Sequence, residues 1–208
     1  MPEDILTLLS GKWEDGSRPA DIAPRVLADK GLLEQILTGL ASRDKKVQGG
    51  CAEIASRVSE QQPSWLYLQL ALFLGNLAAK EPVLRWEAAC TVGNLAAEDA
   101  EGKTLAALPA LIGNFSDKSI VLQGHSLKAM GKIARKHPAA GRLVLGAFKA
   151  NADRFPGNRL GFVAEAVELM ADNTDLRDDM IAFVAPMAES AVAPVAAKAK
   201  RTLRKLRR

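Results

Sequence analysis

The sequence is poor in aromatic residues, cysteine and histidine. Aromatic side chains make up 5% of its 208 residues, and it contains two cysteines and two histidines. No CxxC pair and no His/Cys cluster occurs, so we expect no metal site and assign no cofactor. Cys51 and Cys90 both lie in alanine-rich helical patterns. We interpret them as small residues at or near the core.

Long apolar runs and alternating strand patterns are also missing. The longest apolar candidate, Trp65–Ala79, is shorter than the roughly 18 residues of a transmembrane helix. Met1–Ser10 has no basic start, and Pro2, Glu3 and Asp4 interrupt its apolar pattern, unlike a signal peptide. We therefore expect a cytoplasmic protein without a membrane partner. Alanine and leucine dominate, which favours helices.

Catalytic motifs are absent as well. The sequence has no G-x-S-x-G elbow and no phosphate-binding loop. His125 is predicted on the exposed side of a helix, and His137 beside Pro138 in a turn, neither with a carboxylate nearby in the sequence. We interpret both as solvated or locally hydrogen-bonded side chains. We predict no catalytic residues and no enzyme activity.

An internal repeat is the main feature that the sequence does have. Similar helical segments start at steps of 37, 38, 38 and 35 residues, at Val47, Leu84, Leu122, Leu160 and Val195. Counting that first residue as zero, positions zero, four, seven and eleven share one helix face and are mostly apolar or small, which predicts a buried stripe. Position four is small in every copy: Cys51, Ala88, Ser126, Ala164 and Ala199.

A shorter apolar helix precedes each of these segments. We expect these first helices at 31–42, 63–79, 103–115, 138–153 and 174–188. The brief turns between partners force antiparallel neighbours. Residues 1–30 do not fit the repeat, and we expect them to form short helices that cap the first repeat. The prediction is one all-α structural domain, with a cap at 1–30 and a repeat array at 31–208.

The repeat resembles the HEAT family. Leu108–Asp117, with Pro109, resembles the first helix of a HEAT repeat, and Leu84–Gly93 resembles the second. The resemblance covers residues 31–206, and Gly93–Ala96 is also similar to armadillo repeats. It implies a right-handed α-α superhelix of about five helix pairs. It also implies that the second helices line a concave binding face.

The chain departs from the family pattern at two places. The family's arginine at position one is present only as Arg85, because Gln48 and Gln123 replace it, so no unbroken series of charges between repeats is expected. In the fourth repeat, Glu168 falls at a nominally buried position, which leaves the frame of that repeat open.

Binding candidates lie on the second helices, away from the apolar stripe. Tryptophan is enriched at binding hot spots, which favours Trp86 as a contact; the alternative is that Trp86 packs over Gly49 and Gly50. The Gly49-Gly50 pair itself is interpreted as a close approach of a neighbouring side chain. The full candidate set is Trp86, Asn94, His125, Lys128, Lys132, Arg135, Lys198, Arg201 and Lys205.

Positive charge is concentrated at the C-terminal end. The net charge is +4, yet seven Lys and Arg residues and no acid follow residue 197, which leaves −3 for the rest of the chain. The concave face is therefore expected to become more basic along the chain. The basic end is either a solvated face of the last helix or a site for an anionic partner such as nucleic acid.

These features predict a non-catalytic scaffold that binds a protein or peptide on its concave face. The alternative is a nucleic-acid-binding protein, related to the alkylpurine DNA glycosylases, which use HEAT-like repeats with a basic concave surface. That alternative rests on likeness of fold alone. Those enzymes have an aromatic-lined cleft with an essential carboxylate, and the sequence indicates no convincing acid beside Trp86. A chromophore lyase is a third option, without a motif to support it.

Overall fold

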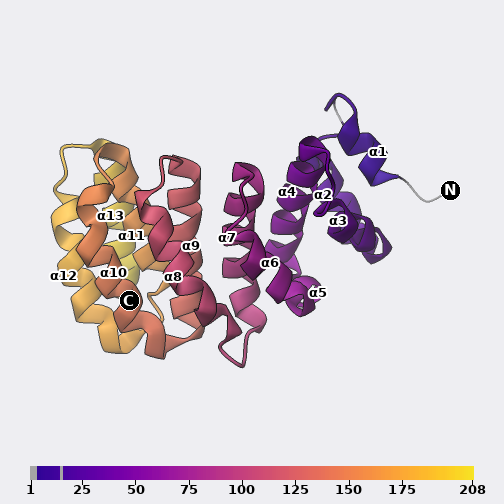
Figure 1. Ribbon diagram of the computed structural model, residues 1–208. Helices are drawn as coiled ribbons and strands as arrows, with labels where there is room; N and C mark the ends of the chain where they lie inside the picture. Colours follow the sequence, from indigo (N-terminus) through magenta and orange to yellow (C-terminus); the bar gives the residue numbers. More distant parts are fainter. Residues whose placement is uncertain (1–3, 15) are drawn as a thin grey trace. The chain divides into compact units, whose positions relative to one another are not determined.

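The computed structural model describes residues 4–14 and 16–208, in which all regular secondary structure is helical. The chain divides into two compact units, which we call unit 1 (Met1–Glu98) and unit 2 (Asp99–Arg208). Each unit contains antiparallel helix pairs, and in every pair except α10 with α11 the first α-helix is shorter than the second (Figure 1).

Unit 1 contains the helices from α1 to α7. Two short helices come first, α1 (Ile5–Ser10) and α2 (Pro19–Ala28). Two helix pairs follow: α3 (Leu33–Gly39) with α4 (Lys45–Gln61), and α5 (Pro63–Leu66) and α6 (Leu70–Asn76) with α7 (Pro82–Leu95). The second helices α4 and α7 pack side by side, and α2 and α1 pack on α4.

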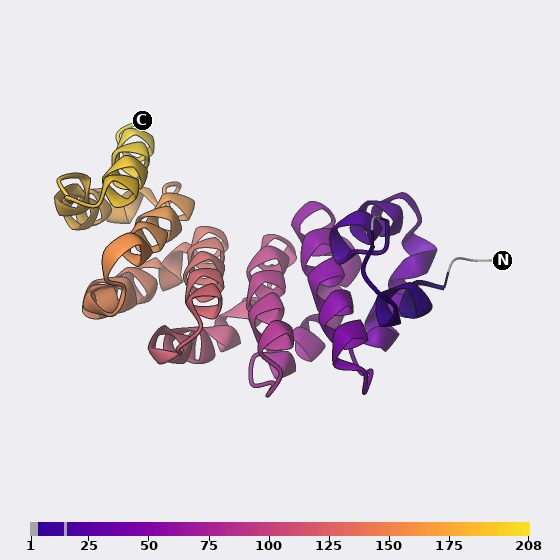
Figure 2. The same ribbon diagram turned by 90° about the horizontal axis from the view of Figure 1, so that it is seen from above.

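Unit 2 contains three helix pairs. They are α8 (Leu108–Gly113) with α9 (Ile120–Lys136), α10 (Gly141–Asn151) with α11 (Leu160–Leu169), and α12 (Arg177–Ala188) with α13 (Ala193–Leu206). Helix α11 packs against both α9 and α13 (Figures 1 and 2). The rings of Phe148 and Phe155 lie 6.3 and 5.2 Å from the ring of Phe115 and fill the core beneath the first helices.

The predicted helical periodicity agrees with the structure. Short 3-10 turns extend the first helices, and with these turns included each predicted boundary agrees to within three residues. The predicted stripe is buried at every position except Leu160, which is half-buried. The two short helices expected before the first repeat are α1 and α2.

The fourth repeat is offset by one residue from the predicted frame. On α9 the residues open to solvent at positions three, six, ten and thirteen are His125, Lys128, Lys132 and Arg135. The same pattern on α11 and the turn that follows it is formed by Phe162, Glu165, Leu169 and Asp172. Position zero of this repeat is therefore Arg159 instead of Leu160. This frame also places Gly161 at position two, where α4 has Gly49 and α9 has Gly124. Glu168 then lies at position nine, and its side chain is 20% exposed.

Glycines allow the second helices to pack closely. An added Cβ at Gly50 would lie 2.8 Å from Leu9 and 3.3 Å from Trp13, and one at Gly49 would lie 3.3 Å from Val83. The helix α4 is therefore approached from one side by the N-terminal segment and from the other by α7. This agrees with the interpretation of Gly49-Gly50 as a close approach. The side chains nearest to the two glycines are Val83, Leu9 and Trp13, and not Trp86 as the alternative in the sequence analysis had it.

Candidate functional site

The candidate surface is the solvent-facing side of the second helices, which we call the second-helix face of each unit. In unit 1 it is formed by α4 and α7. Trp86 is half-buried there, and its indole Nε1 donates a hydrogen bond to Glu87 Oε1 at 3.2 Å. On α4, Arg57 donates to Glu53 at 2.7 Å, and the exposed Glu60 follows one turn later. The face thus combines an indole ring with three carboxylates and one guanidinium.

Glu87 is a residue that the sequence analysis undervalued. Burial raises the pKa of its carboxyl above the ordinary value, and the charge of Glu53 adds to this, whereas hydrogen bonds from Ser56 and Trp86 act in the opposite direction. Adjacent helical residues usually point in different directions, so helical periodicity does not predict a contact between Glu87 and Trp86. The structure places an acid beside the tryptophan, contrary to the prediction.

Asn94 does not face solvent, although it belongs to the predicted binding set. Its side chain is 6% exposed, and its Nδ2 donates to the Ser56 carbonyl oxygen at 3.2 Å and to Ser59 Oγ at 2.8 Å. The small serines of α4 leave room for the amide between the helices, and a buried amide is stable only when it is hydrogen-bonded. Asn94 therefore links α7 to α4 inside unit 1.

In unit 2 the candidate residues on α9 differ in their surroundings. His125 is half-buried, and burial lowers the pKa of its imidazole, with a further decrease from the ammonium groups of Lys128 and Lys132. A neutral imidazole is therefore favoured near pH 7. Lys128 is exposed, whereas Arg135 pairs at 2.8 Å with Asp172, which lies in the turn after α11.

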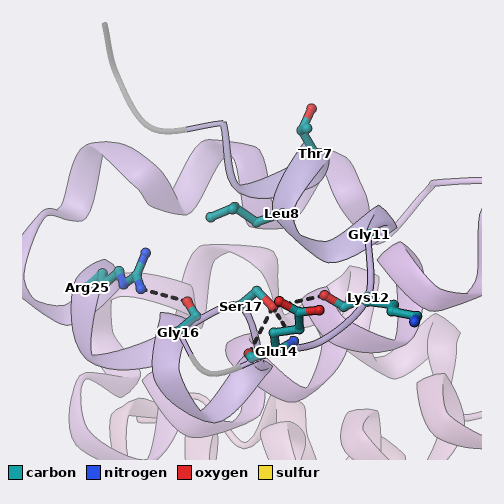
Figure 3. A pocket seen from close by; sticks show the side chains of 8 residues that line it. All are labelled: Thr7, Leu8, Gly11, Lys12, Glu14, Gly16, Ser17 and Arg25. Atoms are coloured by element: carbon teal, nitrogen blue, oxygen red, sulfur yellow. Dashed lines mark hydrogen bonds between the residues drawn. The ribbon is translucent and has the colours of Figure 1, made fainter.

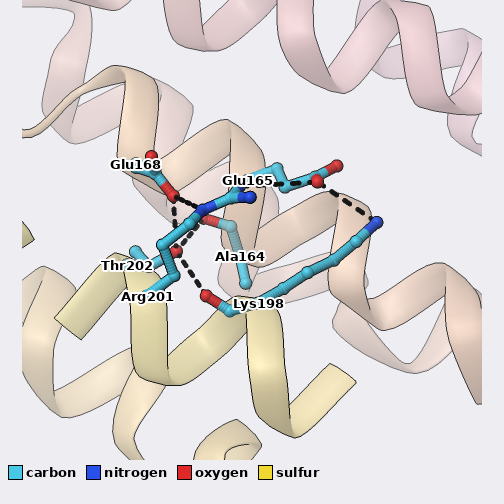
Figure 4. A network of polar contacts seen from close by, with 6 residues as sticks. All are labelled: Ala164, Glu165, Glu168, Lys198, Arg201 and Thr202. Atoms are coloured by element: carbon cyan, nitrogen blue, oxygen red, sulfur yellow. Dashed lines mark hydrogen bonds and ion pairs between the residues drawn. The ribbon is translucent and has the colours of Figure 1, made fainter. Parts of the chain in front are cut away.

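The candidate residues on α13 are largely engaged by α11 (Figure 4). Lys198 Nζ lies 3.2 Å from Glu165 and 4.9 Å from the centre of the Phe162 ring. Arg201 Nε donates to Glu168 at 2.8 Å, and its Nη2 lies 3.5 Å from Glu165. Acidic α11 thus lies between two basic helices, so the expectation of a steadily more basic face is wrong. Lys205 remains exposed.

His137 has a carboxylate partner, which the sequence did not reveal. Its Nε2 lies 3.1 Å from Oδ2 of Asp99, whose side chain is fully buried. The same carboxylate accepts hydrogen bonds from the backbone and hydroxyl of Thr104 at 2.7 and 2.6 Å. Asp99 and His137 are 38 residues apart, which is one repeat period. With the His137 side chain only 14% exposed, the pair joins consecutive repeats instead of facing a substrate.

A pocket of about 440 Å³ lies in the N-terminal segment, between α1, the following loop and Arg25 of α2 (Figure 3). Its polar groups bond mainly to one another. Arg25 donates to the Gly16 carbonyl oxygen at 2.6 Å, and the Ser17 hydroxyl bridges the backbones of Lys12 and Glu14. These contacts explain the loop's own conformation and indicate no ligand.

Within residues 4–14 and 16–208 no group of three or more His, Cys, Asp or Glu side chains is arranged to hold a metal ion. In the same described part of the chain no helix is both long and apolar enough to cross a membrane. Both cysteines are free thiols, Cys51 buried and Cys90 half-buried.

Comparisons with known proteins identify the fold. No protein-family model matches the chain. No curated protein matches it either. Among solved structures, two engineered proteins of the Northeast Structural Genomics Consortium are similar. One is 19% identical, with a TM-score of 0.68 and 98% of both chains covered. The other is 17% identical, with a TM-score of 0.63 over 99% of this chain and 97% of that one.

A designed armadillo repeat protein is also similar, at 15% identity and a TM-score of 0.66, with 97% of this chain and 98% of that chain covered. At such low identity the likeness shows the fold alone. It confirms the resemblance to armadillo and HEAT repeats at that level: the chain has the fold of an all-α helical-repeat solenoid.

Proposed function

We propose that the protein is a non-catalytic scaffold that binds a protein or peptide on the second-helix face of unit 1. The observation that carries the proposal is the half-buried Trp86 beside Glu87. An indole that is held by its neighbours and still partly open to solvent offers a large contact area at low entropic cost, as hot-spot residues do.

The surrounding charges favour a partner with cationic side chains. Glu53, Glu60 and Glu87 contribute carboxylates to the face, and Arg57 is already hydrogen-bonded to Glu53. A lysine or arginine of the partner would relieve the unfavourable burial of the Glu87 charge and could lie against the indole ring.

The surroundings of the two histidines support the non-catalytic part of the proposal. His137 is bound to buried Asp99, and His125 lies beside two lysines with a lowered pKa. Neither is placed as a general base next to a nucleophile, which acyl or phosphoryl chemistry requires.

One observation supports the glycosylase-like alternative, and another opposes it. Glu87 supplies the acid that the sequence seemed to lack beside Trp86. However, Glu53 and Glu60 make this face acidic, which opposes the approach of a phosphate backbone. The second-helix face of unit 1 therefore fits a peptide better than DNA.

The test begins with selection of binders from a displayed random-peptide library, using the full chain. Dissociation constants of the selected peptides are then measured by fluorescence anisotropy for the wild type, Trp86→Ala and Leu68→Ala. The control residue Leu68 is 90% exposed and lies on a first helix, away from the proposed face. We expect Trp86→Ala to weaken binding by roughly 30-fold and Leu68→Ala to leave it unchanged.

Two results would overturn the proposal. One is a set of peptides that bind Trp86→Ala as tightly as the wild type while its helical circular dichroism is unchanged. The other is a selection that yields no peptide above background. Enrichment of Lys and Arg in the selected peptides, and its loss with Glu87→Gln, would support the inferred charge of the partner.

A further inference from the structure

The seven basic residues after residue 197 divide into two groups in the structure. Lys198 and Arg201 point to α11 and pair with Glu165 and Glu168 (Figure 4). The remaining five are exposed, and none of them forms an ion pair with any residue that the structure describes: Lys200, Arg204, Lys205, Arg207 and Arg208. Lys198 and Arg201 thus take part in the packing of α13 on α11, whereas the charges of the other five residues face solvent.

The five exposed cations form one patch. Lys200 and Arg204 are one turn apart on the same side of α13, and Lys205 lies about 100° around the helix axis from Arg204, on the adjoining part of the exposed surface. Arg207 and Arg208 directly follow the last helical residue. The patch extends over about 12 Å along the helix axis, a length over which a duplex presents several phosphates.

Two features of α13 favour a phosphate backbone over a membrane surface. The apolar side of the helix is packed inside unit 2, since Val195, Ala199 and Leu206 are 0% exposed and Leu203 is 7% exposed. No large apolar side chain described on α13 is left to insert between lipids, as interfacial helices require. Three of the five cations are arginines, whose planar guanidinium binds phosphate oxygens in a bidentate manner.

The helix dipole alone does not account for the patch. Cations interact favourably with the partial negative charge of a helix end only within the last turn. Arg204 and Lys205 occupy that turn, whereas Lys200 lies one turn earlier and two further arginines follow. No exposed acid is interspersed among them, although a merely solvated face usually carries both signs.

We propose that the exposed face of α13 binds the phosphate backbone of nucleic acid without base recognition, through Lys200, Arg204, Lys205, Arg207 and Arg208. Lys198 and Arg201 do not take part, because α11 already neutralises them. This site is separate from the peptide face of unit 1, so either proposal can fail without the other.

The test is a salt titration of binding to a fluorescently labelled mixed-sequence DNA duplex, using the full chain. Five phosphate contacts predict a slope of log K against log salt of about −4.5, or roughly a 500-fold loss of affinity between about 50 and 200 mM salt. A patch variant replaces all five residues with Gln. A control variant replaces five other exposed cations, none of them in the candidate binding set, with Gln and so changes the net charge equally: Lys12, Arg43, Lys80, Lys118 and Arg142.

We expect the patch variant to lose more than tenfold in affinity at about 50 mM salt and to show a flattened slope, and the control variant to bind nearly as the wild type does. Equal losses in both variants would overturn the proposal, because they would show a response to net charge alone. So would the absence of duplex binding by the wild type, or binding to phosphatidylserine vesicles in preference to DNA. A duplex of unrelated sequence that binds with the same affinity would support the lack of base recognition.

Discussion

In unit 1 the amide of Asn94 on α7 donates to a carbonyl and a hydroxyl of α4, and this link between consecutive second helices is buried. In unit 2 the contact between α11 and α13 contains one buried bond of this kind, from Thr202 Oγ1 to the Ala164 carbonyl oxygen, and beside it an ion-pair cluster in which the side chain of Arg201 is 51% exposed. The charges that unit 2 adds to this contact are screened by solvent, whereas the Asn94 link in unit 1 is neutral and excludes water. The comparison shows that a charged side chain on a repeat can be bound by the neighbouring repeat. It can be proposed as a contact for another molecule only after that neighbour has been examined.

The two units also differ in overall charge. Unit 1 has 10 Lys and Arg against 13 Asp and Glu, a net charge of −3, whereas unit 2 has 18 against 11, a net charge of +7. The total of +4 conceals these opposite signs. They agree with the two proposals, a cation-accepting face in unit 1 and a phosphate-binding helix in unit 2.

The largest change in the free energy of unfolding is expected when a glycine at a close contact between helices is replaced by alanine. A Cβ at Gly131 in unit 2 would lie 2.5 Å from the carbonyl oxygen of Ala166, which is backbone and cannot turn away. We expect Gly131→Ala to lower the free energy of unfolding in urea by about 3 kcal/mol. At Gly50 in unit 1 the nearest atom belongs to the flexible Leu9 side chain, so Gly50→Ala should cost about 1 kcal/mol.

Gly146→Ala is the matched control for these glycine substitutions. It lies on the exposed side of α10 with nothing within 4 Å of an added Cβ, so alanine should stabilise the helix by up to about 1 kcal/mol. An unchanged unfolding midpoint for Gly131→Ala would contradict the close backbone approach of α9 and α11.

The next prediction compares the stability that the buried Asn94 amide and the exposed Arg201 ion pairs contribute. Asn94→Ala removes a buried amide and leaves its acceptors without that donor, which should cost about 2 kcal/mol at any salt concentration. Arg201→Gln removes an exposed ion pair and should cost about 0.5 kcal/mol at low salt. That smaller cost should vanish in about 1 M NaCl, where charges are strongly screened. Equal costs with equal salt dependence would remove the distinction between the units.

A third prediction introduces into unit 1 a hydrogen bond that is present at the equivalent position of unit 2. Asn114 Nδ2 donates to Ser126 Oγ at 3.0 Å. One period of 38 residues earlier, Asn76 Nδ2 is buried and has no hydrogen-bond partner among the residues that the structure describes, and Ala88 occupies the position that Ser126 has in unit 2. We expect Ala88→Ser to supply the acceptor and to stabilise unit 1 by about 1 kcal/mol. Ala89→Ser, at a fully buried neighbouring position, should destabilise; if both serines destabilise, the equivalence of the two repeats is wrong.

The smallest effect concerns pH. Because the pKa of Glu87 is raised by burial, its charged form is disfavoured in the folded state and destabilises unit 1 above the folded pKa. This cost is lost as the pH falls toward the ordinary carboxyl value. Glu87→Gln should therefore raise Tm by about 1 °C at pH 7, and the difference should shrink in acid. The exposed Glu60→Gln serves as the control, and a lower Tm for Glu87→Gln at neutral pH would refute the assignment.

The candidate site could be predicted only in part from the sequence. Trp86 and the exposed Lys128 and Lys205 lie on the faces that helical periodicity assigned to them. Asn94, Lys198 and Arg201 do not present free polar groups, because Ser56, Glu165 and Glu168 of neighbouring helices bind them. Glu87 went unrecognised because its raised pKa arises from burial by surrounding groups.

The sequence by itself determined the helices, their period and their buried stripe. Residues such as Val47, Cys51 and Ile54 recur at helical spacing, and the amphipathic pattern is local to each helix. The tertiary structure alone decided which polar groups meet. Asp99 with His137, Asn94 with Ser56, and Thr202 with Ala164 are each 38 residues apart. The reason is physical: the exposure and charge of a helix face depend on side chains that the adjacent repeat contributes, one full period away in the chain.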